Sequence, residues 1–330
     1  YEISLGLVGS EMCIRDRHLG GNMKKRIFCL ILALVMVLSL AACAGSGNDN
    51  TENTKDTTTN TEGSEATTPV SGGEAELALI TDANSIDDRG FNQFSWEGLK
   101  QYAEENGKTY TYYTPIDQST QSYLSAIEGA VNNGAKLVVT PGFLFGEAIY
   151  KAQTMYPDVH FVLVDATPTL DDDTVIADNT CSIFFAEEQS GFLAGYAAVK
   201  EGYRKLGFFG ALAVPAVVRF GYGFVDGAEY AAKELGLEAG SIEMKYTYTG
   251  AFGNSPDFQA KAAAWYQSGT ECIFGCGGPD NVFAACEATG GDCVSIGVDT
   301  DMSQITETCL TSAMKMLTPA VYLSLIHISE

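Results

Sequence analysis

Residues 76–103 read ELALITDANSIDDRGFNQFSWEGLKQYA and contain the unit that decides the fold. The first seven residues contain the short apolar run Leu-Ala-Leu-Ile, which is typical of a buried strand. Phe91, Phe94, Leu99 and Tyr102 then recur at the spacing of one helix face. A strand that leads through a polar turn into a helix is the repeating unit of α/β domains. We therefore predict an α/β fold whose ligand-binding side chains follow the ends of the strands.

The same alternation of apolar runs and amphipathic segments continues through the body of the chain. Near-continuous apolar strands between helices predict parallel sheets that are covered on both faces. The predicted strands are 76–82, 110–115, 136–142, 160–166, 205–212, 242–250, 271–277, 293–299 and 309–316. Because these strands are many for one sheet, we predict two doubly wound domains, at 76–182 and 183–302. Residues 303–322, including the last strand, are expected to return to the first domain.

A targeting segment precedes the folded body. Residues 23–42 begin with Met-Lys-Lys-Arg and continue as an apolar run, which is typical of a signal peptide and too short for a comfortable membrane span. Cys43 follows Leu-Ala-Ala and resembles the lipobox cysteine of bacterial lipoproteins, which is lipidated and begins the mature chain. The alternative is an ordinary signal peptide with an incidental cysteine. Residues 43–75 contain few apolar side chains and predict a disordered tether.

Both ends of the chain read as foreign to the native protein. A signal peptide normally begins at its methionine, yet 22 residues precede Met23. We therefore interpret residues 1–22, and the terminal residues 323–330, as non-native sequence. The alternative is a genuine upstream extension and a genuine tail. Because the chain stops just after a helical pattern starts at Pro319, we also expect it to be truncated at its C-terminus.

Composition excludes several classes of function. The chain has 330 residues, of which 19 are Lys or Arg and 42 are Asp or Glu, so that its net charge is −23. Such a charge repels a phosphate backbone, and nucleic acid is not an expected partner. His160 is the one histidine within the predicted domains, and a solvated structural role suits it best. We expect no metal site and no cofactor.

Aspartates and phenylalanines follow several of the predicted strands. Asp82, Asp165 and Asp299 each end an apolar run, where their carboxylates can accept hydrogen bonds from ligand hydroxyls and amines. The alternative is that each aspartate caps the helix after it. Phe91 and Phe252, together with Phe143, lie close to the same ends and could stack on a planar ligand. Each phenylalanine could instead belong to the core.

The cysteines of the body form no zinc-binding spacing. They are Cys181, Cys272, Cys276, Cys286, Cys293 and Cys309. Cys286 and Cys293 are the closest pair that could bridge a loop, because disulfide bonds form outside the cytoplasm. Buried free thiols are the interpretation that we prefer.

Several motifs together resemble the basic membrane protein family of bacterial lipoproteins. They are LALITDANSIDDRGFNQFSWEGL, EQSGFLAGYAA, RFGYGFVDGAEYAAKELG, YTGAFGN, CGG and IGVDTDMS with LTSAMK, and they extend from about residue 77 to residue 322. The resemblance implies a type I periplasmic-binding-protein fold, in which two doubly wound domains close around a hinge. It also implies the ligand contacts. Phe91 and Phe252 would sandwich a base, Asp82, Asn92 and Asp165 would bond its edge or nearby groups, Gly277 would lie against the ligand, and Asp299 and Lys315 would hold the ribose.

The resemblance implies a function without catalysis. The family supplies substrate-binding components of ABC transporters that take up purine and related nucleosides. We expect an extracytoplasmic, monomeric lipoprotein that is anchored in the cell membrane through Cys43 and delivers nucleosides, purines favoured, to a permease and its ATPase. A sugar or autoinducer receptor of the same fold is an alternative. A secreted nucleoside-processing enzyme is another, but the acidic stretch LDDDT at 170–174 is better read as a solvated turn.

Overall fold

The computed structural model describes residues 73–82 and 85–329. The predicted non-native stretch 1–22, the signal peptide at 23–42, the lipidation site Cys43 and most of the predicted tether lie outside the described residues. Their interpretation therefore rests on the sequence.

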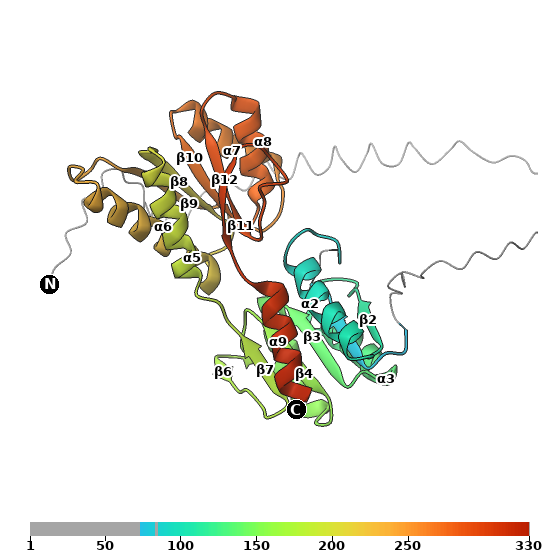
Figure 1. The fold of residues 1–330 in the computed structure, drawn as a ribbon. Coiled ribbons are helices and arrows are strands. Elements are labelled where there is room, and N and C mark those ends of the chain that lie inside the picture. Colours follow the sequence, from blue (N-terminus) through green and yellow to red (C-terminus); the bar gives the residue numbers. More distant parts are fainter. Residues whose placement is uncertain (1–72, 83–84, 330) are drawn as a thin grey trace, which may run out of the picture. The chain divides into compact units, whose positions relative to one another are not determined.

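The first domain contains a sheet of five parallel strands (Figure 1). The strands are β1 (Leu77–Ile80), β2 (Tyr110–Tyr113), β3 (Leu137–Pro141), β4 (His160–Val164) and β7 (Thr180–Ile183). Their order in the sheet is β2-β1-β3-β4-β7. This order, with β1 in the interior of the sheet, is typical of a doubly wound fold.

Helices cover both faces of the first sheet, as the apolar strands predict. One face packs against α2 (Phe91–Glu105) and α9 (Leu317–Ser329). The other face packs against α3 (Thr120–Asn132), the short helix η1 (Phe143–Phe145) and α4 (Gly146–Met155). Alternate residues of β1 divide between the two cores, because side chains of a strand point to opposite faces in turn. Every residue of β1 is buried for this reason.

The second domain repeats the pattern with another sheet of five parallel strands. Its elements are α5 (Glu187–Lys200), β8 (Lys205–Gly210), α6 (Pro215–Glu234), β9 (Glu243–Tyr248), α7 (Pro256–Gln267), β10 (Cys272–Cys276), α8 (Pro279–Thr289), β11 (Val294–Asp299) and β12 (Cys309–Met314). The sheet order is β12-β11-β10-β8-β9. Helices α5 and α6 pack on one face, and α7 and α8 pack on the other.

The last strand corrects one prediction. We expected 309–316 to return to the first domain, but β12 pairs in parallel with β11 in the second sheet. The return to the first domain begins instead with α9, whose Val321 and Leu325 are buried against the first sheet. An apolar strand carries no signal for which of two similar sheets it joins, so the sequence could not decide this point. The interpretation of 323–330 as non-native sequence stays a prediction.

The acidic stretch at 170–174 forms a turn. It connects the two short antiparallel strands β5 (Thr169–Leu170) and β6 (Asp173–Thr174). Asp171 and Asp172 have left-handed φ values of 46° and 68°, which aspartate tolerates better than most residues. Their side chains are exposed, in agreement with a solvated turn.

Helices α5 and α6 are packed unusually close by glycine. A Cβ atom on Gly195 would lie 2.0 Å from the carbonyl oxygen of Phe224, and one on Gly227 would lie 2.0 Å from the carbonyl oxygen of Phe192. Real Cβ atoms do not come so close to a backbone oxygen, so the two helices can approach each other only because these positions lack side chains. This packing fixes α6 against α5.

We predict that Gly227→Ala lowers the free energy of unfolding by about 1–3 kcal/mol, because the new methyl group must push α6 away from α5. Gly129→Ala is the matched control: it lies inside α3, and its new Cβ would meet no atom closer than 3.9 Å. The free energy of unfolding of this control should be unchanged or higher by up to about 1 kcal/mol, since alanine has a higher helix propensity than glycine. Urea unfolding followed by circular dichroism measures both, and equal behaviour of the two variants would contradict the close packing.

Candidate functional site

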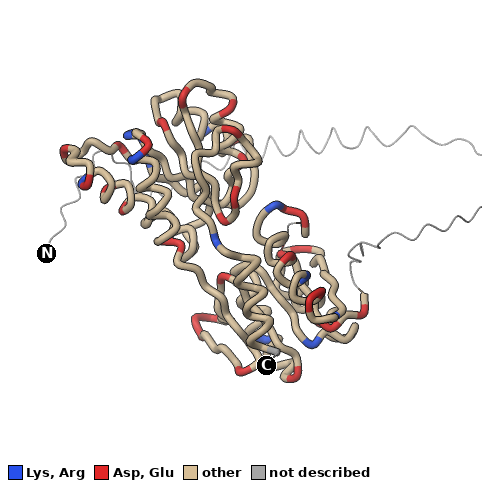
Figure 2. The backbone as a smooth tube through the Cα atoms, viewed as in Figure 1, with Lys and Arg blue, Asp and Glu red and all other residues tan. Residues whose placement is uncertain are grey.

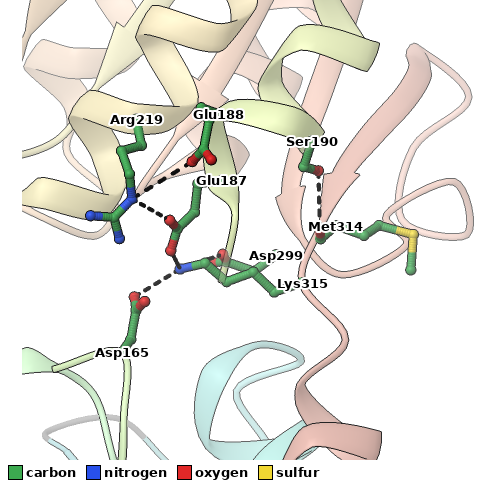
Figure 3. A network of polar contacts seen from close by, with 8 residues as sticks. All are labelled: Asp165, Glu187, Glu188, Ser190, Arg219, Asp299, Met314 and Lys315. Atoms are coloured by element: carbon green, nitrogen blue, oxygen red, sulfur yellow. Dashed lines mark hydrogen bonds and ion pairs between the residues drawn. The ribbon is translucent and has the colours of Figure 1, made fainter. Parts of the chain in front are cut away.

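Two chain segments connect the domains within the described residues. One runs from the end of β7 at Ile183 to the start of α5 at Glu187, and the other runs from the end of β12 at Met314 to the start of α9 at Leu317. The Ser190 hydroxyl of α5 donates a hydrogen bond of 3.0 Å to the carbonyl oxygen of Met314, the last residue of β12, where the second segment begins (Figure 3). Segments of this kind are where a hinge between two domains bends.

Lys315 lies in the second connecting segment and is almost fully buried, with 3% of its side chain exposed. Its Nζ lies 2.8 Å from Asp165 Oδ2, 3.3 Å from Glu187 Oε1 and 3.5 Å from Asp299 Oδ1 (Figure 3). Asp165 follows β4 of the first domain, whereas Glu187 begins α5 and Asp299 ends β11 of the second. One buried cation therefore bridges carboxylates of both domains.

The two aspartates occupy matching positions with matching backbone geometry. Asp165 has a φ of 67° and Asp299 a φ of 65°, both in the left-handed region. The Asp165 N–H donates to the Ile183 carbonyl at 2.7 Å, and the Lys315 N–H donates to the Asp299 carbonyl at 2.8 Å. Aspartate is one of the few residues besides glycine that enter this region readily. These strand-end turns direct both carboxylates to the same ammonium group.

Glu187 and Arg219 complete the arrangement, and sequence reasoning missed both. The Glu187 side chain is fully buried, and its Oε2 accepts a hydrogen bond of 2.6 Å from Arg219 Nε of α6. A glutamate in the first turn of a helix is expected from the helix dipole alone, so its position carried no sign of a buried role. We refer to Lys315, Asp165, Glu187, Asp299 and Arg219 as the Lys315 cluster.

The Lys315 cluster contains three carboxylates and two cations, which leaves one negative charge in excess. Burial raises the pKa of Asp165 to about 6, although Lys315 opposes the shift, and burial also raises the pKa of Asp299. Burial acts in the same direction on Glu187, but Arg219 and Lys315 outweigh it and lower its pKa. Burial lowers the pKa of Lys315, but the attraction of the three carboxylates is stronger and raises it above its ordinary value. Lys315 therefore stays charged.

Aromatic rings surround the same ammonium group. Lys315 Nζ lies 5.2 Å from the ring centroid of Phe91, 5.6 Å from that of Phe185 and 5.3 Å from that of Phe220. Each ring lies within the range of a cation–π interaction. Phe91 is the first residue of α2, so the start of this helix brings an aromatic ring directly to the cluster.

Asp82 and Asn92 bind to each other. The Asn92 Nδ2 donates to Asp82 Oδ1 at 2.8 Å and to Asp88 Oδ2 at 2.9 Å, and Asn92 Oδ1 accepts from the Asp82 N–H at 3.0 Å. Asp88 also accepts from the N–H groups of Asn92 and Gln93 in the first turn of α2. Asn92 is fully buried, and its hydrogen bonds to Asp82 and Asp88 stabilise the turn between β1 and α2. Its contact with a ligand stays a prediction.

Phe252 and Gly277 form a second group in the second domain. Gly277 follows β10 with a φ of 101°, and a Cβ there would lie 2.5 Å from Ala211 Cβ and 2.9 Å from Phe252 Cδ1. Phe252 is 44% exposed, and its ring centroid lies 5.8 Å from that of Phe143. The two rings assigned to one sandwich therefore make different contacts: Phe91 lies against Lys315 and Phe252 against Phe143.

Acidic residues outnumber basic residues in the chain, 42 against 19. In Figure 2, basic residues are scattered singly among more numerous acidic residues.

Among the described residues, no group of His, Cys, Asp and Glu has the arrangement of a metal site. No helix within 73–82 and 85–329 is both long enough and apolar enough to cross a bilayer.

Two parallel-sheet domains that are joined by connecting segments define the type I periplasmic-binding-protein fold. The model of the family described as "ABC transporter substrate-binding protein PnrA-like" matches residues 75–329, and the chain belongs to this family. The family and the relatives below are solute-binding proteins rather than enzymes. The predicted family and fold are thus confirmed.

Individual relatives agree with the family. The ABC transporter nucleoside-binding protein BmpA of Lactococcus lactis is 31% identical over 264 residues, which are 78% of this chain and 66% of that protein. Basic membrane protein A1 of Borrelia garinii is 30% identical over 247 residues, or 73% and 68% of the two chains. A solute-binding protein of an ABC transporter system from Aeropyrum pernix superimposes with a TM-score of 0.65 at 27% identity, over 77% of this chain and 70% of that one. The chain thus spans about two thirds of these curated relatives.

The pKa of Asp165 predicts how stability depends on pH. The carboxyl titrates at about 6 in the folded protein and at 3.8 in ordinary surroundings, so between these values the folded state holds a proton that the unfolded chain releases. Stability from this group therefore rises as pH falls through 6 and is complete below 3.8. Asp165→Asn is neutral at every pH. The free energy of unfolding of this variant minus that of the wild type should therefore be more positive at about pH 7.5 than at about pH 4, by on the order of 1–3 kcal/mol.

Urea unfolding over this pH range measures the difference. The exposed Asp178 provides the control, since Asp178→Asn should leave the pH profile of the wild type unchanged. A constant difference between Asp165→Asn and the wild type at all pH values would refute the raised pKa.

Proposed function

We propose that the protein binds nucleosides, purines favoured, between its two domains and delivers them to an ABC permease and its ATPase. The observation that carries the proposal is the Lys315 cluster, in which a buried cation and strand-end carboxylates of both domains meet beside an aromatic ring. Phe91 supplies that ring. The names of the relatives support the proposal, because one of them is a nucleoside-binding protein.

The cluster offers hydrogen-bonding groups that suit a ribose. Asp165 Oδ1 is buried and has no hydrogen-bond partner among the described residues, and Asp299 Oδ1 makes only the 3.5 Å ion pair with Lys315. Vicinal hydroxyls can donate to such carboxylate oxygens while their own oxygens accept from the Lys315 ammonium. This arrangement would leave the charges of the cluster unchanged. A ligand held in this way touches both domains.

The excess negative charge discriminates among related ligands. A phosphate group carries about two negative charges at neutral pH, and it would enter a site that already has one negative charge too many. A free base would leave the carboxylates without hydroxyl donors. A nucleoside meets both requirements, because it is neutral and presents hydroxyls to the cluster while its base can stack on Phe91 and Phe252.

The position of the cluster also explains how binding would close the domains. A ligand moves a two-state equilibrium only through its differential affinity for one state. Lys315 and Glu187 lie at the two connecting segments, so bonds that a ligand makes with the Lys315 cluster depend directly on the hinge angle. A nucleoside that contacts Asp165 of one domain and Asp299 of the other is expected to favour the closed state.

The sequence upstream of the domains completes the proposed role. Cys43 would carry the lipid that holds the protein on the outer side of the cell membrane, and the tether up to residue 75 would let the domains reach the permease. We expect a monomer, because capture and delivery need only one pair of domains.

Thermal unfolding of the purified protein with separate ligand classes tests the function. A ligand that binds only the folded state raises the midpoint of unfolding. We expect a rise with purine nucleosides, a smaller rise with pyrimidine nucleosides, and none with nucleoside monophosphates. A rise with pentoses alone would replace the proposal by a sugar receptor, and conversion of a nucleoside during incubation would replace it by an enzyme.

Phe252→Ala tests the stacking contact. Loss of the ring should weaken a nucleoside by about 1–3 kcal/mol but should leave a pentose almost unaffected, because only the base has a flat face. Tyr230→Ala is the control, since this tyrosine is 56% exposed on α6 and contacts Phe192, away from the cluster. Isothermal titration calorimetry measures the affinities. Equal losses for nucleoside and pentose would remove Phe252 from the base site.

A further inference from the structure

Two cysteines of the second domain meet at a tight turn that plays no part in the proposed binding site. Cys286 lies in the last turn of α8, and Cys293 immediately precedes β11. Gly290 and Gly291 between them have left-handed φ values of 67° and 77°, which fold the chain back on itself. The Sγ atoms of Cys286 and Cys293 lie 3.0 Å apart.

We propose that Cys286 and Cys293 form an intramolecular disulfide bond. Two sulfur atoms at 3.0 Å are closer than a comfortable non-bonded contact, and a bond of about 2.05 Å needs only a further approach of about 1 Å. Rotation of two short side chains can supply this approach without moving the backbone. The Cys293 sulfur is already turned inward, within 3.4 Å of the Cys286 carbonyl oxygen and 3.3 Å of the Gly290 carbonyl oxygen.

The structure selects this pair among the cysteines that it describes. The Cys309 sulfur is turned to the Thr311 carbonyl oxygen at 3.2 Å and to Ser312 Oγ at 3.6 Å. Cys272 and Cys276 are buried on the same strand, where the side chains face the core beneath α5 and α6. Cys181 belongs to the first sheet. The four cysteines therefore serve as internal references that should remain thiols.

Exchange with a small-molecule disulfide, such as glutathione disulfide, would form the bond. Cys293 is the more exposed partner, whereas Cys286 is buried and its pKa is raised to about 12 by that burial. The Cys293 thiolate attacks the small disulfide and releases one thiol, which gives a mixed disulfide on Cys293. Cys286 then loses its proton, attacks the Cys293 sulfur and releases the second thiol. Two protein thiols are oxidised and one small disulfide is reduced to two thiols.

The bond would join two elements that lead to the binding site. Helix α8 starts directly after Gly277 and Gly278, and β11 ends at Asp299. A bond from the end of α8 to the start of β11 closes a short loop and restricts the unfolded chain. The disulfide bond would stabilise the second domain without contacting a ligand. Whether the bond forms is therefore independent of which solute the protein binds.

Alkylation mapping after oxidation tests the proposal. Purified protein is treated with glutathione disulfide, unfolded in denaturant, alkylated with iodoacetamide and analysed by peptide mass spectrometry. We expect Cys286 and Cys293 to be protected as one cross-linked peptide pair, and Cys181, Cys272, Cys276 and Cys309 to be alkylated. Alkylation of both Cys286 and Cys293 would overturn the proposal.

The thermal midpoint gives a second readout. Reduction of the oxidised protein should lower the midpoint by about 5–10 °C, as expected for a short closed loop in a chain of this size. Cys293→Ser should abolish this redox-dependent difference, because the more exposed partner is lost, whereas the control Cys309→Ser should retain it. If the difference persists in Cys293→Ser, another cysteine pair is responsible and the proposal is wrong.

Discussion

The buried ion pairs of Lys315 are the constraint on which the rest of the structure depends. Removing an ammonium group from water costs several kcal/mol, so such a charge persists only where well-placed partners compensate for it. Here the partners come from elements far apart in sequence: Asp165 after β4, Glu187 at the start of α5 and Asp299 at the end of β11. Left-handed turns direct the two aspartates, and close glycine packing of α5 on α6 holds Arg219 against Glu187.

Much of the fold could be predicted because its signals are local. Apolar strands and amphipathic helices alternate, and Asp82, Asp165 and Asp299 end strands where ligands bind in such sheets. Lys315 was expected in the same site only because the resemblance to the family implies it. The sequence could not place β12, because an apolar strand suits either sheet. The sequence also carried no sign that Glu187 is buried, because its burial depends on Arg219, 32 residues away, and on the close approach of α5 and α6.

The site also shows which side-chain contacts a family resemblance leaves open. Asp82 and Asn92 were both expected to face a ligand, yet they share hydrogen bonds that fasten the turn before α2. Phe252 pairs with Phe143, which the sequence pattern also predicted as a ring that could stack on a planar ligand. Contacts between side chains depend on loop geometry at the scale of an ångström, whereas residue types and spacing determine only which groups are available.

The structure of the protein with a bound purine nucleoside would test the central claim most directly. The measured quantity is the distance from Lys315 Nζ to the ribose oxygens. The Lys315 cluster predicts a hydrogen bond between Nζ and a ribose hydroxyl, with a second hydroxyl donating to Asp165 or Asp299 and with Glu187 still paired to Arg219. A nucleoside that binds with Lys315 held only by its three carboxylates, and with its ribose remote from all of them, would contradict the account.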